Sequence, residues 1–137
     1  MKRMAWVLAV VALLTSAAMA QSGTFITASV PFAFFAGETR MPAGEYRISY
    51  YGPSGDILVI ANHKSGEVVG IMSYREGSAN RDANPKLVFH NYREGYFLAR
   101  VLMANREMRE LPQTRTEREF SAQARPDEIT VVARLNK

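Results

Sequence analysis

Short apolar runs separated by glycine- and proline-containing turns recur along most of this chain, and they restrict it to an antiparallel β fold. The clearest run is 45–51, in which Tyr46, Ile48 and Tyr50 alternate with polar residues. A period of two places every second side chain on the same face of a strand. The run therefore predicts a half-buried strand.

Other runs have the same character. Residues 57–61 (ILVIA) are almost continuously apolar, as expected of a central strand. The first run contains Pro31, which indicates a bend or an edge strand because proline cannot donate to a ladder. The remaining predicted strands are 24–35, 67–74, 86–92, 96–103 and 128–135.

Turn signals separate these runs. Gly-Pro-Ser-Gly-Asp at 52–56 predicts a turn in which proline fixes φ and glycine supplies positive φ. Arg-Glu-Gly at 93–95 predicts a hairpin, and residues 75–85 predict a loop because they have no periodicity. Tyr-Arg-Glu-Gly occurs at both 74–77 and 92–95 with different flanks, which we interpret as similar turn chemistry at two sites.

One helix is predicted late in the chain. Thr114 and Glu117 have the spacing of a capping box, in which a threonine side chain accepts a hydrogen bond from the third residue of the helix. The following residues are rich in Arg, Glu, Gln and Ala, and Pro126 would end the helix. We therefore expect a short surface helix near 114–125, anchored by Phe120.

This order of elements predicts an all-β domain: a compact antiparallel β-sandwich or small barrel of about six to eight strands, with one short surface helix. The sequence leaves sandwich and barrel both open. An outer-membrane barrel is disfavoured, because its strands need about nine to eleven residues and most runs here are shorter.

The first twenty residues have the organisation of an export signal. Lys2 and Arg3 give a positive start, and residues 5–14 form an unbroken apolar run. A membrane-spanning helix needs about twenty such residues, so this run is too short to serve as one. The segment 1–20 is therefore predicted to direct export.

The predicted cleavage site follows this run. Ala18 and Ala20 place small residues at the two positions that a signal peptidase reads. Cleavage after Ala20 makes Gln21 the first residue of a single β-rich domain, 21–137. We therefore expect the protein in the periplasm or outside the cell, with no stable membrane span after cleavage.

Composition narrows the chemistry of this domain. Its formal charge falls from +4 to +2 when Lys2 and Arg3 are removed, so nucleic acid is a poor partner. The chain has no cysteine, which excludes disulfides, thiol catalysis and zinc sites built on thiolates. The core alone must therefore stabilise the fold.

Three segments carry motifs that occur together in known proteins. They are VPFAFFAGETRMPAGEYRI (30–48), KLVFHNYREGYFL (86–98) and RELPQTRTEREF (109–120). With their Val-Pro-Phe-x-Phe strand, Pro-Ala-Gly-x-Tyr turn, Lys-Leu-Val-Phe strand and charged Leu-Pro segment, they resemble a family of small, uncharacterised exported bacterial proteins. Met41 stands where that family has leucine. The resemblance implies an all-β domain and export, but it brings no activity, ligand or catalytic residue to carry over to this chain.

No catalytic or metal-binding spacing is evident. His63 lies in a predicted turn, where exposure is the usual outcome, and His90 lies in a strand, where a packed, hydrogen-bonded histidine is expected. No serine lies in a Gly-x-Ser-x-Gly elbow, and there is no phosphate-binding glycine loop or calcium loop. We therefore expect no enzyme activity, no cofactor and no metal.

Two functions remain. The favoured one is a non-catalytic binding module of the cell envelope, which contacts a protein or polymer through a sheet edge or the charged segment 104–125. The alternative is a carrier of a small apolar ligand, held in a cavity between sheets. Its lining would be aromatic: Phe32, Phe34, Phe35, Tyr46, Tyr50, Phe89 and Phe97. The sequence does not determine the oligomeric state.

Overall fold

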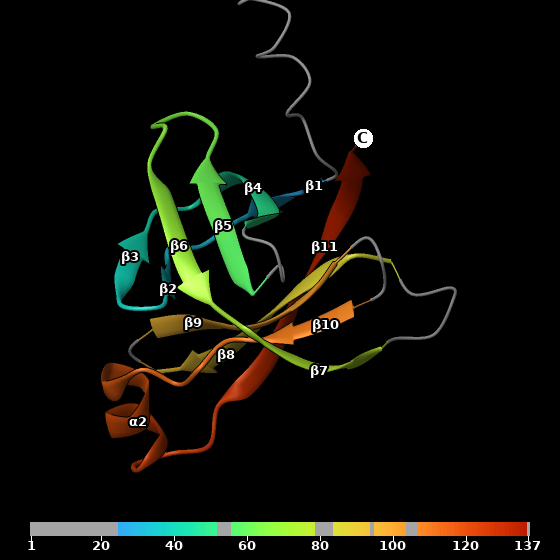
Figure 1. The fold of residues 1–137 in the computed structure, drawn as a ribbon. Coiled ribbons are helices and arrows are strands. Elements are labelled where there is room, and N and C mark those ends of the chain that lie inside the picture. Colours follow the sequence, from blue (N-terminus) through green and yellow to red (C-terminus); the bar gives the residue numbers. More distant parts are fainter. Residues whose placement is uncertain (1–24, 52–55, 79–83, 94, 104–106, 137) are drawn as a thin grey trace, which may run out of the picture.

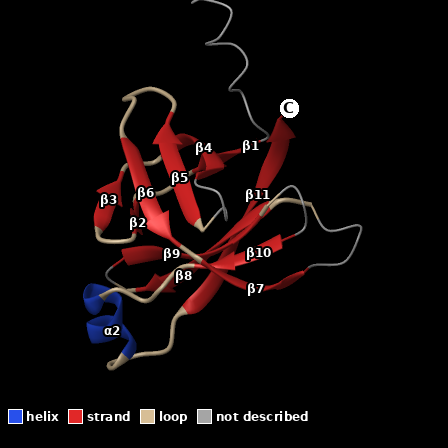
Figure 2. Ribbon diagram, in the orientation of Figure 1, coloured by secondary structure: helices blue, strands red, loops and turns tan. Residues whose placement is uncertain are grey.

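The computed structural model describes residues 25–51, 56–78, 84–93, 95–103 and 107–136. This part of the chain is all-β, as predicted, with one short helix at one end of the molecule (Figure 2). In chain order the elements are β1 (Phe25–Val30), β2 (Phe34–Ala36), β3 (Thr39–Met41), β4 (Gly44–Tyr51), β5 (Ile57–Asn62), β6 (Val68–Met72), β7 (Tyr74–Ser78), β8 (Lys86–Tyr92), β9 (Gly95–Leu102), β10 (Glu107–Glu110), α2 (Arg115–Ser121) and β11 (Asp127–Asn136).

Eleven described strands exceed the predicted six to eight. The predicted run 24–35 divides into β1 and β2, because the chain bends after Pro31. The predicted loop 75–85 is wrong at its start, where β7 forms, and residues 79–83 lie outside the described part. β10 occupies a polar stretch with no strand pattern. Both β7 and β10 exist because they pair with each other across the chain.

The strands form a nearly closed, barrel-like sheet in the order β3-β2-β9-β8-β11-β1-β4-β5-β6. β10 adds to β9, and β7 adds to β10. The long strand β11 joins the two halves of the barrel. Its residues 127–132 pair with β8, and its residues 133–136 pair with β1 (Figure 1).

The core lies inside this barrel. Period-two alternation buries Ile26, Ala28 and Val30 on β1 and Tyr46 and Ile48 on β4. Each large apolar side chain buried in this way contributes about 1.5–3 kcal/mol. The largest fully buried side chains on the other strands are Phe34, Met41, Leu58, Ile60, Leu87, Phe89, Val101 and Leu102.

The helix is shorter than predicted. Thr114 is its N-cap, and the Thr114 hydroxyl accepts from the backbone N–H of Glu117 at 3.2 Å, as the capping box predicts. The helix ends at Ser121 instead of residue 125. Residues 121–125 are all exposed, so a longer helix would bury no further apolar surface. Phe120 is the predicted anchor.

The anchor is confirmed by ring contacts. The centroid of the Phe120 ring lies 5.6 Å from that of Phe97 and 6.0 Å from that of Tyr92. These contacts place α2 against β8 and β9 and leave a cleft beside it.

Candidate functional site

A half-open cleft of about 520 Å³ lies between α2, the segment that precedes it, and strands β7 to β9 and β11. Part of its wall is apolar, with the rings of Phe35 and Phe97 stacked at a centroid distance of 4.9 Å and an interplanar angle of 14°. Leu111 and Pro112 continue this wall. The rest of the lining is polar.

The deepest polar contact joins His90 and Glu117. His90 Nδ1 lies 3.0 Å from Glu117 Oε1, and the imidazole N–H donates to the carboxylate. The Glu117 side chain is only 7% exposed, against 29% for His90. The cap at Thr114 begins the helix so that its first turn directs Glu117 toward β8. His90 is therefore the hydrogen-bonded histidine that the sequence predicts.

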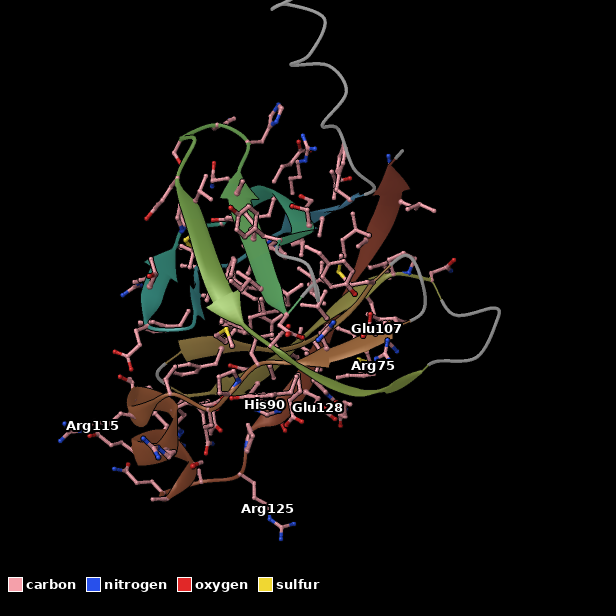
Figure 3. The ribbon with its side chains drawn as sticks, viewed as in Figure 1. Arg75, His90, Glu107, Arg115, Arg125 and Glu128 are labelled. Atoms are coloured by element: carbon pink, nitrogen blue, oxygen red, sulfur yellow. The ribbon has the colours of Figure 1, made fainter. Side chains whose placement is uncertain are left out.

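A second polar group lies on the same cleft. Arg100 on β9 contacts the carboxylate of Glu128 on β11, and its Nη1 lies 3.9 Å from Glu76 Oε1 on β7. In strand register Glu128 pairs with His90 (Figure 3), and Glu110 pairs with Arg100. The cleft thus gathers side chains from six strands, β2 and β7 to β11, and from the helix.

The described lining of the cleft is acidic. It carries four carboxylates, those of Glu76, Glu110, Glu117 and Glu128, and one guanidinium, that of Arg100. Glu110 is exposed and has no ion-pair partner within the described part of the chain. A cleft with a ring wall and excess negative charge suits a cationic group, because carboxylates and aromatic faces both attract cations.

Metal chemistry has no support in this lining. Among the residues that the structure describes, no three His, Asp or Glu side chains are placed to hold a metal ion. The two histidines also lie apart. His63 is exposed, and it lines a separate hollow of about 630 Å³ on the outer face of β1, β4 and β11.

Another charged cluster lies away from the cleft, beside β4 and β10. Arg109 is 5% exposed, and its guanidinium contacts Glu107 Oε1 at 3.1 Å and Asp56 Oδ1 at 3.3 Å. Glu107 Oε1 also accepts from Arg75 Nε at 2.6 Å (Figure 3). The Arg109 guanidinium lies 5.4 Å from the ring centroid of Tyr50. This cluster ties β10 to β4 and β7, so we assign it to structure.

Two groups in this cluster have a clearly altered pKa: the hydrogen bond to Glu107 raises the pKa of Arg75, and the pKa of Tyr50 is raised as well. Burial raises the pKa of Tyr50 to about 12, with Glu107 adding to the rise and Arg109 opposing it. The Tyr50 hydroxyl donates to Glu107 Oε2 at 3.3 Å. Both effects extend to higher pH the range over which the phenol stays protonated.

The aromatic residues predicted as a cavity lining are used in three ways. Phe34, Tyr46 and Phe89 are fully buried and pack edge to face, with centroids 5.1 and 5.2 Å from Phe34. Phe32 contacts Phe89 and stacks on Tyr96. Tyr50 lies in the Arg109 cluster, and Phe35 and Phe97 form the wall of the cleft described above.

The sequence did not mark the acidic residues of the cleft as a group. Glu110 and Glu117 lie in the charged segment 104–125 that it offered as a contact surface, but no pattern marks Glu76 and Glu128, and only the fold brings the four together. Glu117 had a signal, the capping box, but that motif predicts a helix start and not a buried carboxylate. The predicted cleavage residues Ala18, Ala20 and Gln21 lie outside the described residues.

Two further findings concern membrane spans and similarity to known proteins. In the described residues, no helix is both long and apolar enough to cross a membrane. No protein-family model, curated protein sequence or solved structure matches the chain.

Proposed function

We propose that this protein is an exported, non-catalytic binding module of the cell envelope, and that its cleft beside α2 receives a positively charged group of a protein or polymer partner. The observation that carries the proposal is the acidic lining of the cleft, four carboxylates against one guanidinium. Export rests on the organisation of residues 1–20 and the small residues Ala18 and Ala20.

The arrangement of the cleft favours binding over catalysis. His90 directs Nδ1 to Glu117, and the Thr114 hydroxyl accepts the bond that caps the helix. The carboxylates of Glu76 and Glu128 face Arg100. These polar groups are hydrogen-bonded or ion-paired with one another, as in a preorganised binding surface. Among the described carboxylates of the cleft, Glu110 remains open to a partner.

We prefer this function to that of a carrier. A carrier needs an apolar cavity inside the barrel, and the rings of Phe34, Tyr46 and Phe89 pack against one another there. No observation on the described residues favours an enclosed ligand.

The test is a titration with charged peptides. We expect an oligolysine peptide to bind the protein, with affinity that falls as salt is added, and an oligoglutamate peptide not to bind. Glu110→Lys should abolish binding. Glu119→Lys makes the same charge change at an exposed helix position away from the cleft lining and should leave binding close to wild type.

Two results would count against this function. One is an absence of oligolysine binding at low salt, and the other is an equal loss of binding in both variants, which would mean that only net charge matters. Export is tested separately by cell fractionation and by N-terminal sequencing of the accumulated protein, which should begin at Gln21.

A further inference from the structure

The strand β6 forms one end of the sheet, and its outer edge is open. Among the described strands it pairs with β5 alone. The turn between β2 and β3 lies near the buried Ile71 of β6, since a Cβ built on Gly37 would lie 3.6 Å from the Ile71 side chain. No described strand pairs with the edge of β6 that faces away from β5.

The hydrogen-bond phase shows which residues face this edge. The backbone N–H of Asn62 donates to Glu67 O at 2.8 Å, and that of Ser73 donates to Asp56 O at 2.7 Å. Hydrogen-bonded and non-hydrogen-bonded pairs alternate in an antiparallel ladder. Every second residue of β6 therefore directs its N–H and C=O away from β5: Val68, Gly70 and Met72.

These three positions are also exposed. Val68 is 60% and Met72 54% exposed, and Gly70 between them is exposed as well. A Cβ on Gly70 would meet only Ile57, at an ordinary contact distance of 3.5 Å, so the fold itself does not require glycine there. Gly70 has no side chain to shield its backbone groups, which lie at the middle of the edge.

This edge lacks the features by which proteins protect edge strands. Such edges usually carry a lysine or another charge, a proline or a bulge. The sequence of β6, Val-Val-Gly-Ile-Met, has none of these, and its register with β5 is regular. An open, uncharged edge of this kind is a pairing surface.

We propose that β6 pairs antiparallel with β6 of a second copy of the chain, with Gly70 opposite Gly70 across a two-fold axis. This register places Val68 of each copy opposite Met72 of the other, both apolar. The hydrogen-bonding residues Val68, Gly70 and Met72 then meet one another in phase.

Charge favours the same occupant. The nearest charged residues in the sequence are Glu67 before β6 and Arg75 after it, and both are exposed. Antiparallel pairing brings the beginning of one strand beside the end of the other, so Glu67 of each copy approaches the end that carries Arg75 of the other. Arg75 contacts Glu107 of its own chain, but its side chain is 74% exposed and remains accessible to a second carboxylate. A parallel arrangement would bring like charges together and would lose the two-fold symmetry that closes a dimer.

The outer face of the sheet also continues across such a pair. Tyr51, Ile57 and Met72 are direct cross-strand neighbours on β4, β5 and β6, and Tyr51 is 68% exposed. Val68 of the second copy would extend this apolar row. A single strand pair buries little area, so we expect a dimer that forms reversibly with concentration.

The experiment is sedimentation equilibrium on the protein expressed from its full reading frame and purified in the form that accumulates. We expect the weight-average mass to rise from monomer toward dimer with concentration. Val68→Lys should remain monomeric at every concentration. Val132→Lys is the matched control, because Val132 is 70% exposed but lies on the interior strand β11, and it should dimerise like the wild type.

Amide hydrogen exchange locates the contact. The amides of Gly70 and Met72 should exchange more slowly as the wild-type concentration rises, and not in Val68→Lys. Met72→Lys serves as a second edge variant if Val68→Lys does not fold. A wild-type protein that stays monomeric, or equal loss of association in Val132→Lys, would overturn the proposal. Slowing of these amides only by an added foreign peptide would also overturn it.

Discussion

His90 Nδ1 and Glu117 Oε1, 27 residues apart in the sequence, meet at 3.0 Å and connect β8 to the first turn of α2. A helix of seven residues is too short to be stable by itself. Its position therefore depends on tertiary contacts: this hydrogen bond, the Thr114 cap and the rings around Phe120. These contacts therefore hold the helical wall of the cleft, which carries Glu117, against the strands that carry the other three carboxylates.

Removal of the buried carboxylate should weaken the fold. Glu117→Ala removes the hydrogen bond to His90, and a hydrogen bond to a charged group contributes about 1.5–3 kcal/mol. Urea denaturation measures the loss in the free energy of unfolding. Glu119→Ala, whose side chain is 64% exposed, should change it by less than about 0.5 kcal/mol. Equal effects at the two positions would contradict the role of the His90–Glu117 contact.

The helix cap gives a smaller, independent effect. Thr114→Ala removes the acceptor for the Glu117 N–H and should cost about 1 kcal/mol of unfolding free energy. Thr114→Ser keeps the hydroxyl and should stay near wild type. Thermal unfolding followed by circular dichroism compares the two, and a serine variant as unstable as the alanine variant would argue against the cap.

The buried Arg109 cluster should be sensitive to the loss of its cation. Arg109→Met leaves Glu107 buried beside a half-exposed Asp56, and breaking a buried ion pair costs about 3–5 kcal/mol. Arg75→Met also removes a partner of Glu107, but the Arg75 side chain is 74% exposed, so its effect should be much smaller. Chemical denaturation of both variants measures the loss in the free energy of unfolding, which should be larger for Arg109→Met. A larger loss for Arg75→Met would contradict the prediction.

Tyr50 should make stability depend on alkaline pH. Its pKa is about 12 in the folded protein against 10.0 for an unperturbed phenol, so the folded state binds the proton more tightly. The resulting stabilisation is complete below pH 10 and is lost as the pH rises from 10 through 12. Tyr50→Phe cannot ionise there, and its unfolding free energy should fall less over this range.

The measurement is urea denaturation of both proteins at a series of pH values from 9 to 12. Burial also raises the pKa of Tyr46 and Tyr92, so the difference between wild type and Tyr50→Phe isolates Tyr50. Parallel curves for the two proteins would mean that Tyr50 does not ionise differently in the folded state.

Local patterns predicted several strands closely, including 128–135, which is β11 in the structure although its partners β8 and β1 lie far away in the sequence. The predicted strands 45–51, 86–92 and 96–103 agree with the structure within one residue at each end. The alternation of apolar and polar residues in these strands indicates one buried face. The turn residues beside them indicate that the next strand runs antiparallel. β8 and β9 are joined through the predicted turn, so short-range information is sufficient there.

The repeated tetrapeptide shows that short-range sequence information is not always sufficient. Tyr-Arg-Glu-Gly at 92–95 spans the end of β8 and the start of β9, as a turn should, but at 74–77 the same residues lie within strand β7. β7 is extended because it pairs with β10, about thirty residues further along the chain. No local pattern carries that information, so the prediction of similar turns was wrong at 74–77.

The candidate site was harder to predict for the same reason. The charged segment 104–125 reads as a solvent-exposed surface, and nothing in its sequence indicates that Glu117 is buried. The burial of Glu117 depends on the position of β8, which the segment does not encode. Glu76, Arg100 and Glu128 come from three strands that meet only in the folded barrel. The residue types alone indicate that these positions are charged. Only the strand topology shows that they lie together in one cleft.

The shared strand β11 has a consequence for how the protein is made. It pairs with β8 through one half and with β1 through the other, so a chain that lacks residues 127–136 cannot join the two halves of the barrel. Contacts between the earliest and latest strands also slow folding, since a long loop must close first. A nascent chain therefore cannot close its barrel until its last strand has left the ribosome, and the export proposed above would draw on the chain in that open state.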